Sequence, residues 1–231
     1  MLSPELVDQF QQNGFCAAEG FLTRKEVAGF VNSIERICTG ATIEHHDATR
    51  LEMEPDQERE GSRVRRIYEP CTYYPLTNTD SLAVLVYLDD ADRSNGCLQV
   101  IPGVHRNGIL NHSCDGFFRG QITEPVDVSK AIALEGAAGT AIFLHGMTPH
   151  ASAPNASGHG RRTLILGYRA ADAYPIFAGE TTLHAELHVR PVRGEWCPLA
   201  RFGTQSVPIP RFQDVPKSLY ELQQRFREKQ S

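Results

Sequence analysis

Short apolar runs separated by turn sequences fill the chain from residue 82 onward, and this pattern restricts the fold more than any other feature. Residues 82–88 (LAVLVYL) have the length of a buried strand and are too few for an ordinary helix. The DDADRSNG sequence that follows is typical of a turn. Similar apolar runs occur at residues 97–101, 131–134, 140–144 and 162–168. The pattern predicts a mainly β fold, as a barrel or a sandwich.

Helix signals lie at the two ends of the chain. Ser3 and Pro4 suit the N-cap and the first position of a helix. Thr23 and Glu26 have the spacing of a capping box, in which each side chain accepts a backbone N–H of the other residue. Apolar residues recur at helical spacing once more over residues 218–228.

The length and the order of these signals predict the domain organisation. A chain of 231 residues can bury one sizeable core. We therefore expect a single domain over residues 1–231, with a helical N-terminal flank at 3–40, a barrel at about 63–190 and a C-terminal helix at 218–228. Within it, the highly charged residues 41–72 are expected to form a loop with one short strand around 63–68.

Composition excludes several classes of protein. The net charge is −5, with no basic stripe of the kind that binds nucleic acid, and no run of 18 apolar residues suggests a membrane span. The 6 cysteines include no CxxC pair, which argues against a zinc ribbon or finger. The N-terminus lacks the layout of a secretory signal. We expect a cytoplasmic protein with reduced thiols that acts on a small molecule, with neither nucleic acid nor a membrane as partner.

His150 and Arg161 form the pattern most indicative of chemistry. The histidine follows the apolar run at 140–144 and the arginine opens the next run, so we expect them on adjacent strands of a barrel. A neutral imidazole is a good ligand of iron(II). The planar guanidinium group matches a carboxylate with two parallel hydrogen bonds. The hydroxyl of Ser152 can add a donor to the same carboxylate.

Two further blocks accompany this pattern. One is NGCLQVIPGVHR at residues 95–106, with the turn sequence before it, and the other is the G-F-x-x-x-x-G-F-L sequence at residues 14–22. On these three blocks, residues 3–175 resemble the phytanoyl-CoA dioxygenase family of non-haem iron, 2-oxoglutarate-dependent oxygenases. The resemblance implies a double-stranded β-helix, a jelly-roll or cupin-like barrel with flanking α-helices.

The resemblance also implies cofactors and roles. Iron(II) and 2-oxoglutarate are the expected cofactors, and the expected reaction is hydroxylation of a small aliphatic or acyl substrate. His150 corresponds to a metal ligand. Arg161 with Ser152 corresponds to the clamp for the far carboxylate of 2-oxoglutarate, with Arg162 as the alternative, and Asn155 corresponds to a structural position.

One family motif has no recognisable copy. The family places a His-x-Asp pair shortly before an aromatic-aromatic-Pro sequence, which is Tyr73-Tyr74-Pro75 here. In that register Tyr68 and Pro70 stand at the ligand positions, and neither replaces an imidazole or a carboxylate there. The pair at His45 or His46 and Asp47 lies about 26 residues too early in that register, and burying its charged loop in the mouth of the barrel would be costly.

The remaining histidines fit structural roles. His184, Glu186 and His188 superficially resemble a zinc pair, but that spacing chelates on a helix and this stretch has the alternation of a strand. His105 is expected to make a structural hydrogen bond, and His145 to pack in the core.

Two functions remain open. The first is an oxygenase, with impaired activity, in which His45 and Asp47 or other groups complete the site. The second is a catalytically inactive protein that binds or scaffolds. A cupin-like binder of small molecules without iron is a third, weaker alternative.

Overall fold

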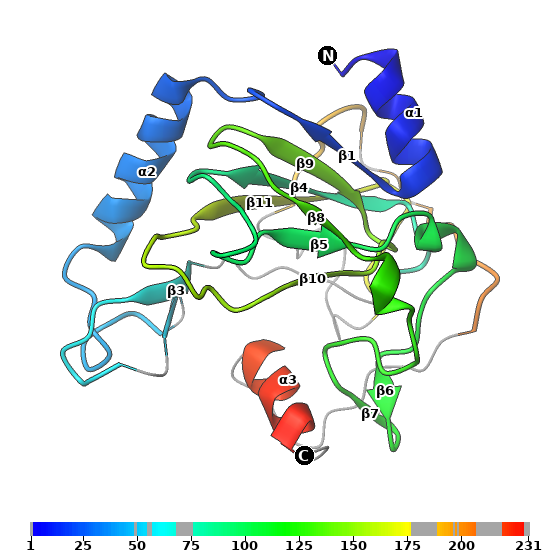
Figure 1. The fold of residues 1–231 in the computed structure, drawn as a ribbon. Coiled ribbons are helices and arrows are strands. Elements are labelled where there is room, and N and C mark those ends of the chain that lie inside the picture. Colours follow the sequence, from blue (N-terminus) through cyan, green and yellow to red (C-terminus); the bar gives the residue numbers. More distant parts are fainter. Residues whose placement is uncertain are drawn as a thin grey trace.

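Two antiparallel sheets lie face to face in the computed structural model, which describes residues 2–48, 50–54, 57–67, 76–176, 189–195, 197, 199–206 and 219–228. The larger sheet has the strand order β1 (Phe15–Ala18), β9 (Ala141–His145), β4 (Ser81–Tyr87) and β11 (Thr163–Arg169). The smaller sheet has the order β10 (His150–Ser152), β5 (Leu98–Val100) and β8 (Ile132–Leu134). The predicted mainly β architecture is confirmed (Figure 1).

Two short two-stranded sheets lie outside this pair. The first joins β2 (Leu51–Met53) to β3 (Val64–Ile67), and the second is the hairpin of β6 (Ser113–Cys114) and β7 (Phe117–Phe118). The strand expected around residues 63–68 is confirmed by β3. The sequence prediction missed β2, β6, β7 and β10.

The helices occupy the periphery, as expected. They are α1 (Pro4–Asn13), α2 (Arg24–Cys38) and α3 (Leu219–Glu228), with 3₁₀ turns η1 (Val104–Asn107) and η2 (Val128–Lys130). Both predicted N-terminal signals are confirmed, because Ser3 caps α1 with Pro4 in its first turn and Thr23 forms a capping box with Glu26.

Gly14 ends α1 in the left-handed conformation, with φ of 80°, which glycine adopts without strain. A Cβ atom at this position would also collide with the side chains of Thr148 and His105. The close approach places the C-terminus of α1 directly against the turn that precedes β10.

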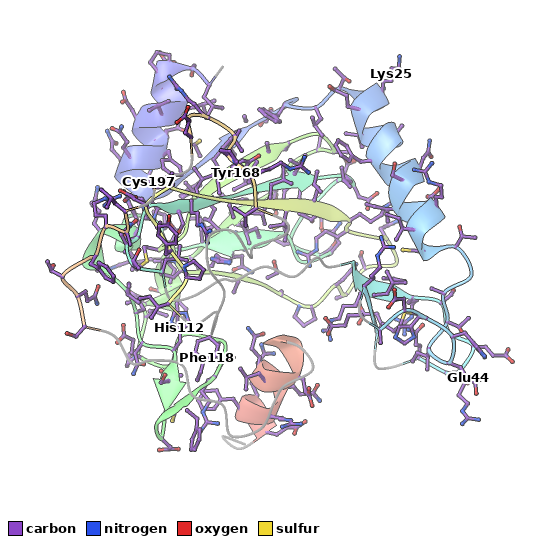
Figure 2. All side chains as sticks on the ribbon, turned by 180° about the vertical axis from the view of Figure 1, so that it is seen from behind. Lys25, Glu44, His112, Phe118, Tyr168 and Cys197 are labelled. Carbon is purple, nitrogen blue, oxygen red and sulfur yellow. The ribbon has the colours of Figure 1, made fainter. Side chains whose placement is uncertain are left out.

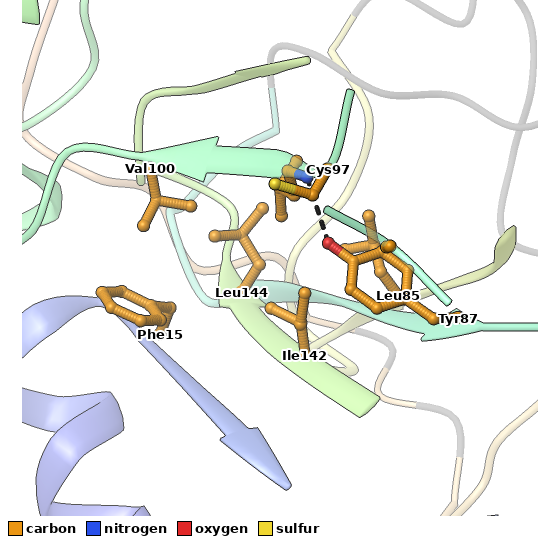
Figure 3. Close-up of a cluster of buried hydrophobic side chains, with 9 residues drawn as sticks. Phe15, Leu85, Tyr87, Cys97, Val100, Ile142 and Leu144 are labelled. Carbon is orange, nitrogen blue, oxygen red and sulfur yellow. Dashed lines mark hydrogen bonds between the residues drawn. The ribbon is translucent and has the colours of Figure 1, made fainter. Parts of the chain in front are cut away.

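The main core fills the space between the two sheets (Figure 3). Apolar side chains from both sheets meet there: Phe15, Leu85, Tyr87, Ala91, Cys97, Leu98, Val100, Ile142 and Leu144. The hydroxyl of Tyr87 on β4 donates to the carbonyl of Leu134 on β8 at 2.8 Å and accepts from the N–H of Leu98 on β5 at 3.0 Å. A buried side chain of the larger sheet therefore fixes two strands of the smaller one.

A second, smaller cluster lies on the other face of the larger sheet. Val84, Val86 and Ala141 form its buried part, and Leu22 from the segment before α2 packs against them. Of the residues of α2, only Val27 is buried, while Phe30 and Ile37 are exposed. Contacts at its first turn and an ion pair from Glu35 to Arg162 therefore hold α2.

The C-terminal residues that the structure describes return to the sheets. Arg201 forms ion pairs with Asp80, next to the start of β4, and with Asp172, just after β11. The side chain of Gln205 exchanges hydrogen bonds with both backbone groups of Ile109. No helix in the described ranges is long and apolar enough to cross a membrane.

Candidate carboxylate and metal site

Arg161 lies between the two sheets, as the carboxylate clamp requires. Its Nη1 donates to Ser152 Oγ at 3.0 Å and to the carbonyl of Gly96. The guanidinium charge also interacts with Tyr87 and Cys97 of the main core. The structure thus brings together the two residues predicted to hold 2-oxoglutarate.

The Arg161 side chain has a further donor that could bind an anion. The Nε atom of Arg161 is buried and has no hydrogen-bond partner among the described residues. A buried donor on a cation costs free energy when it lacks an acceptor. A carboxylate of 2-oxoglutarate would supply that acceptor, so the residues present fit the cofactor.

Arg162, the alternative residue for binding the far carboxylate, already pairs with carboxylates of the protein itself. It binds Asp89 through two side-chain hydrogen bonds, Nε to Oδ2 at 2.9 Å and Nη2 to Oδ1 at 2.6 Å. These bonds hold the pKa of Asp89 below its usual value. Because Nη1 of Arg162 also pairs with Glu35 at 3.3 Å, this guanidinium serves to join α2 to the larger sheet.

His150 begins β10 with an exposed side chain. Its Nδ1 lies 2.9 Å from the carbonyl oxygen of Thr148. In a neutral ring this bond requires the hydrogen on Nδ1, which leaves the lone pair on Nε2, and metal-binding histidines commonly have this arrangement. His150 therefore fits one ligand position of a metal.

The prediction that His150 and Arg161 lie on adjacent strands is wrong. His150 pairs with Val100 in the smaller sheet, whereas Arg161 precedes β11 of the larger sheet. The residues between them cross from one sheet to the other, and the site bridges the two layers. Asn155 stabilises this crossing, as its expected structural role requires, by donating to the carbonyl of His159 at 2.7 Å and accepting from Ser157 N–H at 2.9 Å.

The His45–Asp47 pair does not reach His150. Figure 1 shows β2–β3 and the loop before them at the end of the sheets away from η1, whereas His150 pairs with Val100, at the η1 end of β5. In the loop, His46 Nδ1 bonds to the carbonyl oxygen of Thr42 at 2.9 Å. Within the described ranges, no group of three or more His, Cys, Asp or Glu residues could hold a metal ion.

Several predicted features fall outside the described residues. They are Tyr68, Pro70 and the Tyr73–Pro75 sequence, and the His184, Glu186 and His188 pattern.

The two histidines expected to be structural lie together under α1. His105 Nε2 is 3.2 Å from the carbonyl oxygen of Gln11, which confirms the expected hydrogen bond. His145 packs with ring centroids 5.3 Å from His105 and 6.0 Å from Phe10. Burial lowers the pKa of His145, and the neighbouring His105 adds to this effect.

The sequence motifs do not identify Gly96 as a residue of the site, although its carbonyl accepts a hydrogen bond from Nη1 of Arg161. Gly96 lies in the turn before β5, 65 positions before Arg161 in the sequence. No local signal could therefore have identified this contact.

Part of the chain is similar to proteins of known family. Residues 67–163 match the model of the phytanoyl-CoA dioxygenase family. A probable alpha-ketoglutarate-dependent hypophosphite dioxygenase of Stutzerimonas stutzeri is 34% identical over 116 residues, which are 47% of this chain and 41% of that protein. A methylphosphonate hydroxylase of Gimesia maris is 32% identical over 85 residues, 37% of this chain and 32% of that protein. The chain thus spans less than half the length of these relatives.

Solved structures share the fold. The epimerase SnoN, in complex with Fe³⁺, alpha-ketoglutarate and nogalamycin RO, superposes with a TM-score of 0.56 and 16% identity over 87% of this chain and 95% of that one. EvdO2 from Micromonospora carbonacea gives a TM-score of 0.53 and 20% identity over 76% of this chain and 96% of that one. At these identities the likeness concerns the fold alone.

Proposed function

We propose that this chain is a member of the phytanoyl-CoA dioxygenase family, whose domain model matches residues 67–163, and that it is an iron(II)- and 2-oxoglutarate-dependent oxygenase with impaired activity. The single observation that carries the proposal is the buried Nε of Arg161 beside Ser152, which has no partner in the part of the chain that the structure describes. The two sheets are proposed to be the halves of a double-stranded β-helix, within one domain.

Each site residue has a proposed role. Arg161 and Ser152 bind the far carboxylate of 2-oxoglutarate and so orient its other end toward His150. The hydrogen bond from His150 Nδ1 to Thr148 fixes the ring with Nε2 as the metal-binding atom. Iron(II), when bound with 2-oxoglutarate and dioxygen, would supply the oxidant that hydroxylates a carbon.

The substrate is proposed to be a small aliphatic or acyl molecule. The two relatives named above act, by their names, on hypophosphite and methylphosphonate, which supports a small molecule. A small phosphorus oxyanion is therefore a second substrate class to assay.

A second candidate is an inactive protein that binds 2-oxoglutarate without turning it over. It is favoured by the lack of a three-residue ligand group within the described ranges, since one imidazole alone holds iron(II) poorly.

One experiment separates the two functions. The protein would be incubated with iron(II), dioxygen and 2-oxoglutarate without a substrate, and succinate would be measured beside calorimetric binding of 2-oxoglutarate. Succinate above the iron-free control supports the oxygenase. Binding without succinate supports the inactive binder, and absence of binding contradicts both.

A further inference from the structure

Alternate residues of β11 face the main core between the two sheets. Ile165 pairs with Leu85, a buried residue of that core, and Gly167 pairs with Ala83, which packs against it. Residues directly opposite each other on paired strands lie on the same face of a sheet. Ile165 and Gly167 therefore lie on the inner face of the larger sheet, whereas Tyr168, labelled in Figure 2, lies on the outer face.

Both inner positions are open, although they face the core. Ile165 is 56% exposed, whereas its partner Leu85 is 9% exposed. At Gly167, no atom of the described residues lies within 4 Å of an added Cβ atom. In the part of the chain that the structure describes, the inner face of β11 is therefore uncovered beyond the edge of the core.

This open part of β11 runs beside β10. At one end, Arg161, just before β11, donates to Ser152, the last residue of β10, at 3.0 Å. At the other end, Gly146, shortly before β10, donates its N–H to the carbonyl of Ser81 at 2.8 Å. Ser81 pairs with Arg169, the last residue of β11. Both strands therefore extend in the same direction from the carboxylate clamp.

The inner face of β10 carries the candidate metal ligand. His150 and Ser152 pair with Val100 and Leu98 of the main core, so both side chains lie on the inner face of the smaller sheet. From the clamp, His150 lies about 7 Å along β10 and Ile165 about 13 Å along the facing chain. A molecule that extends from His150 away from the clamp would pass over Ile165.

The chemistry of the inner face changes along this stretch. It begins at the charged Arg161, continues with the hydroxyl of Thr163, and has no polar side-chain atom at Ile165 and Gly167 before it ends at Arg169. Exposed apolar surface gains free energy when an alkyl group covers it, because both are removed from water. A small oxyanion gains nothing from contact with Ile165.

We propose that the substrate carries an aliphatic chain that lies on Ile165 and over Gly167, and that these two residues determine which chains are accepted. Ile165 supplies the apolar contact, and Gly167 leaves room for the chain. This inference rests on the proposed function as an oxygenase. It favours an aliphatic or acyl substrate over a small phosphorus oxyanion.

Binding of neutral alcohols to the protein saturated with 2-oxoglutarate tests the inference without turnover. The probes are 1-butanol, 1-hexanol and 1-octanol, which leave Arg161 to the cofactor. By calorimetry, we expect the affinity to rise up to about fourfold for each added methylene group. In methyl NMR spectra, 1-hexanol should shift the δ1-methyl signal of Ile165, which Ile165→Val identifies, and methylphosphonate should leave it unchanged.

Variants on the two faces of β11 show where the chain binds. Ile165→Ser removes the apolar contact and Gly167→Asp places a charge in the path of the chain, so each is expected to weaken binding of 1-octanol at least about fivefold. Leu166→Ser is the matched control, because Leu166 is 41% exposed and lies on the outer face. It should bind the alcohol as the parent does. Thermal melts show that each variant folds.

The outcomes separate this inference from the proposed function. If methylphosphonate shifts the Ile165 signal and the alcohols do not, or if Leu166→Ser weakens binding as much as Ile165→Ser, the inference is overturned. The proposed function stands in both cases as long as the parent binds 2-oxoglutarate. A parent that binds no 2-oxoglutarate contradicts the proposed function, and the inference falls with it.

Discussion

Arg161 and Arg162 are adjacent in the chain, yet their guanidinium groups have different partners. Among the described residues, Arg161 contacts neutral oxygens and has one buried donor without a partner, whereas Arg162 is bound by two carboxylates. We expect Arg161→Ala to weaken 2-oxoglutarate binding by about 2–5 kcal/mol, because a charged contact to the carboxylate is lost. Isothermal calorimetry measures the change.

The control for this prediction is Arg162→Ala. Loss of its pairs with Asp89 and Glu35 should lower the melting temperature and leave 2-oxoglutarate affinity unchanged. If Arg161→Ala binds the cofactor as tightly as the parent, the carboxylate role belongs to another residue.

Gly96 supports the clamp from the turn before β5. Its φ is 80°, and an added Cβ atom would collide with the carbonyl of Ala153 in the segment after β10. We expect Gly96→Ala to destabilise the fold by about 1–2 kcal/mol through its backbone conformation, and to weaken 2-oxoglutarate binding because its carbonyl holds Arg161. Chemical denaturation and calorimetry report the two effects.

Gly20→Ala is the matched variant. Gly20 also has a positive φ, of 58°, but nothing lies within 4 Å of an added Cβ atom. Gly20→Ala should lower the stability of the fold without weakening the binding of 2-oxoglutarate. Equal affinities for the two variants would show that the close approach at Gly96 does not position Arg161.

For single residues, the sequence predicts relations between positions that are close together in the chain. The spacing of His150, Ser152 and Arg161 is a property of one stretch of chain, and the structure places Ser152 and Arg161 in contact. The choice between Arg161 and Arg162 depends on Asp89 and Glu35, which are distant in sequence. For the same reason the contact of Arg161 with the carbonyl of Gly96 could not be predicted.

Elements with strong local signals were predictable, and short polar ones were not. The capped helices and the apolar strands β4, β9 and β11 follow from caps and hydrophobic runs. In contrast, β10 has the sequence His-Ala-Ser and is exposed throughout. It is a strand because its backbone pairs with β5, and such pairing leaves no trace in the hydrophobic pattern.

The helix α3 docks on the β6–β7 hairpin. Phe226 is 6% exposed, and its ring lies 5.3 Å from the guanidinium carbon of Arg119. Gln223 Nε2 donates to the carbonyl of Gly120 at 2.6 Å. The amphipathic sequence predicts that this helix packs on the barrel, whereas these contacts are to Arg119 and Gly120, directly after the hairpin.

Phe226→Ala is expected to destabilise the protein by about 3 kcal/mol, because a buried aromatic ring and its contact with Arg119 are lost. Differential scanning calorimetry should show a melting temperature lower by roughly 6–12 °C. The exposed Arg227→Ala on the same helix should melt as the parent does. An unchanged melt for Phe226→Ala would mean that α3 contributes nothing to the stability of the fold.

At the scale of the whole molecule, acid lowers the stability of the fold by protonating two kinds of group, buried histidines and carboxylates paired with arginines. Burial, with His105 nearby, lowers the pKa of His145, and Asp80 opposes this change only in part. Hydrogen bonds from Arg162 and Arg201 lower the pKa values of Asp89 and Asp172. In every case the folded state binds fewer protons than the unfolded state, so acid favours unfolding.

The two kinds of group act in different pH ranges. The contribution of His145 is complete above the unfolded pKa of about 6.5 and is lost as the pH falls below it toward the folded value. The contribution of the aspartates is lost only below their unfolded pKa of about 3.9. We therefore expect the melting temperature to fall in two steps, between about pH 7 and 5 and again below about pH 4.

His145→Gln removes the part of the first step that His145 contributes. Glutamine can still accept the N–H of Met147, which bonds to His145 Nδ1 at 3.1 Å, but it takes up no proton in this range. Because burial also lowers the pKa of His112, we expect this variant to lose part of the fall between pH 7 and 5 and to retain the fall at lower pH. His159→Gln, which removes an exposed histidine, should keep both steps. If the fall between pH 7 and 5 persists in full in His145→Gln, the protonation that destabilises the protein occurs at another group.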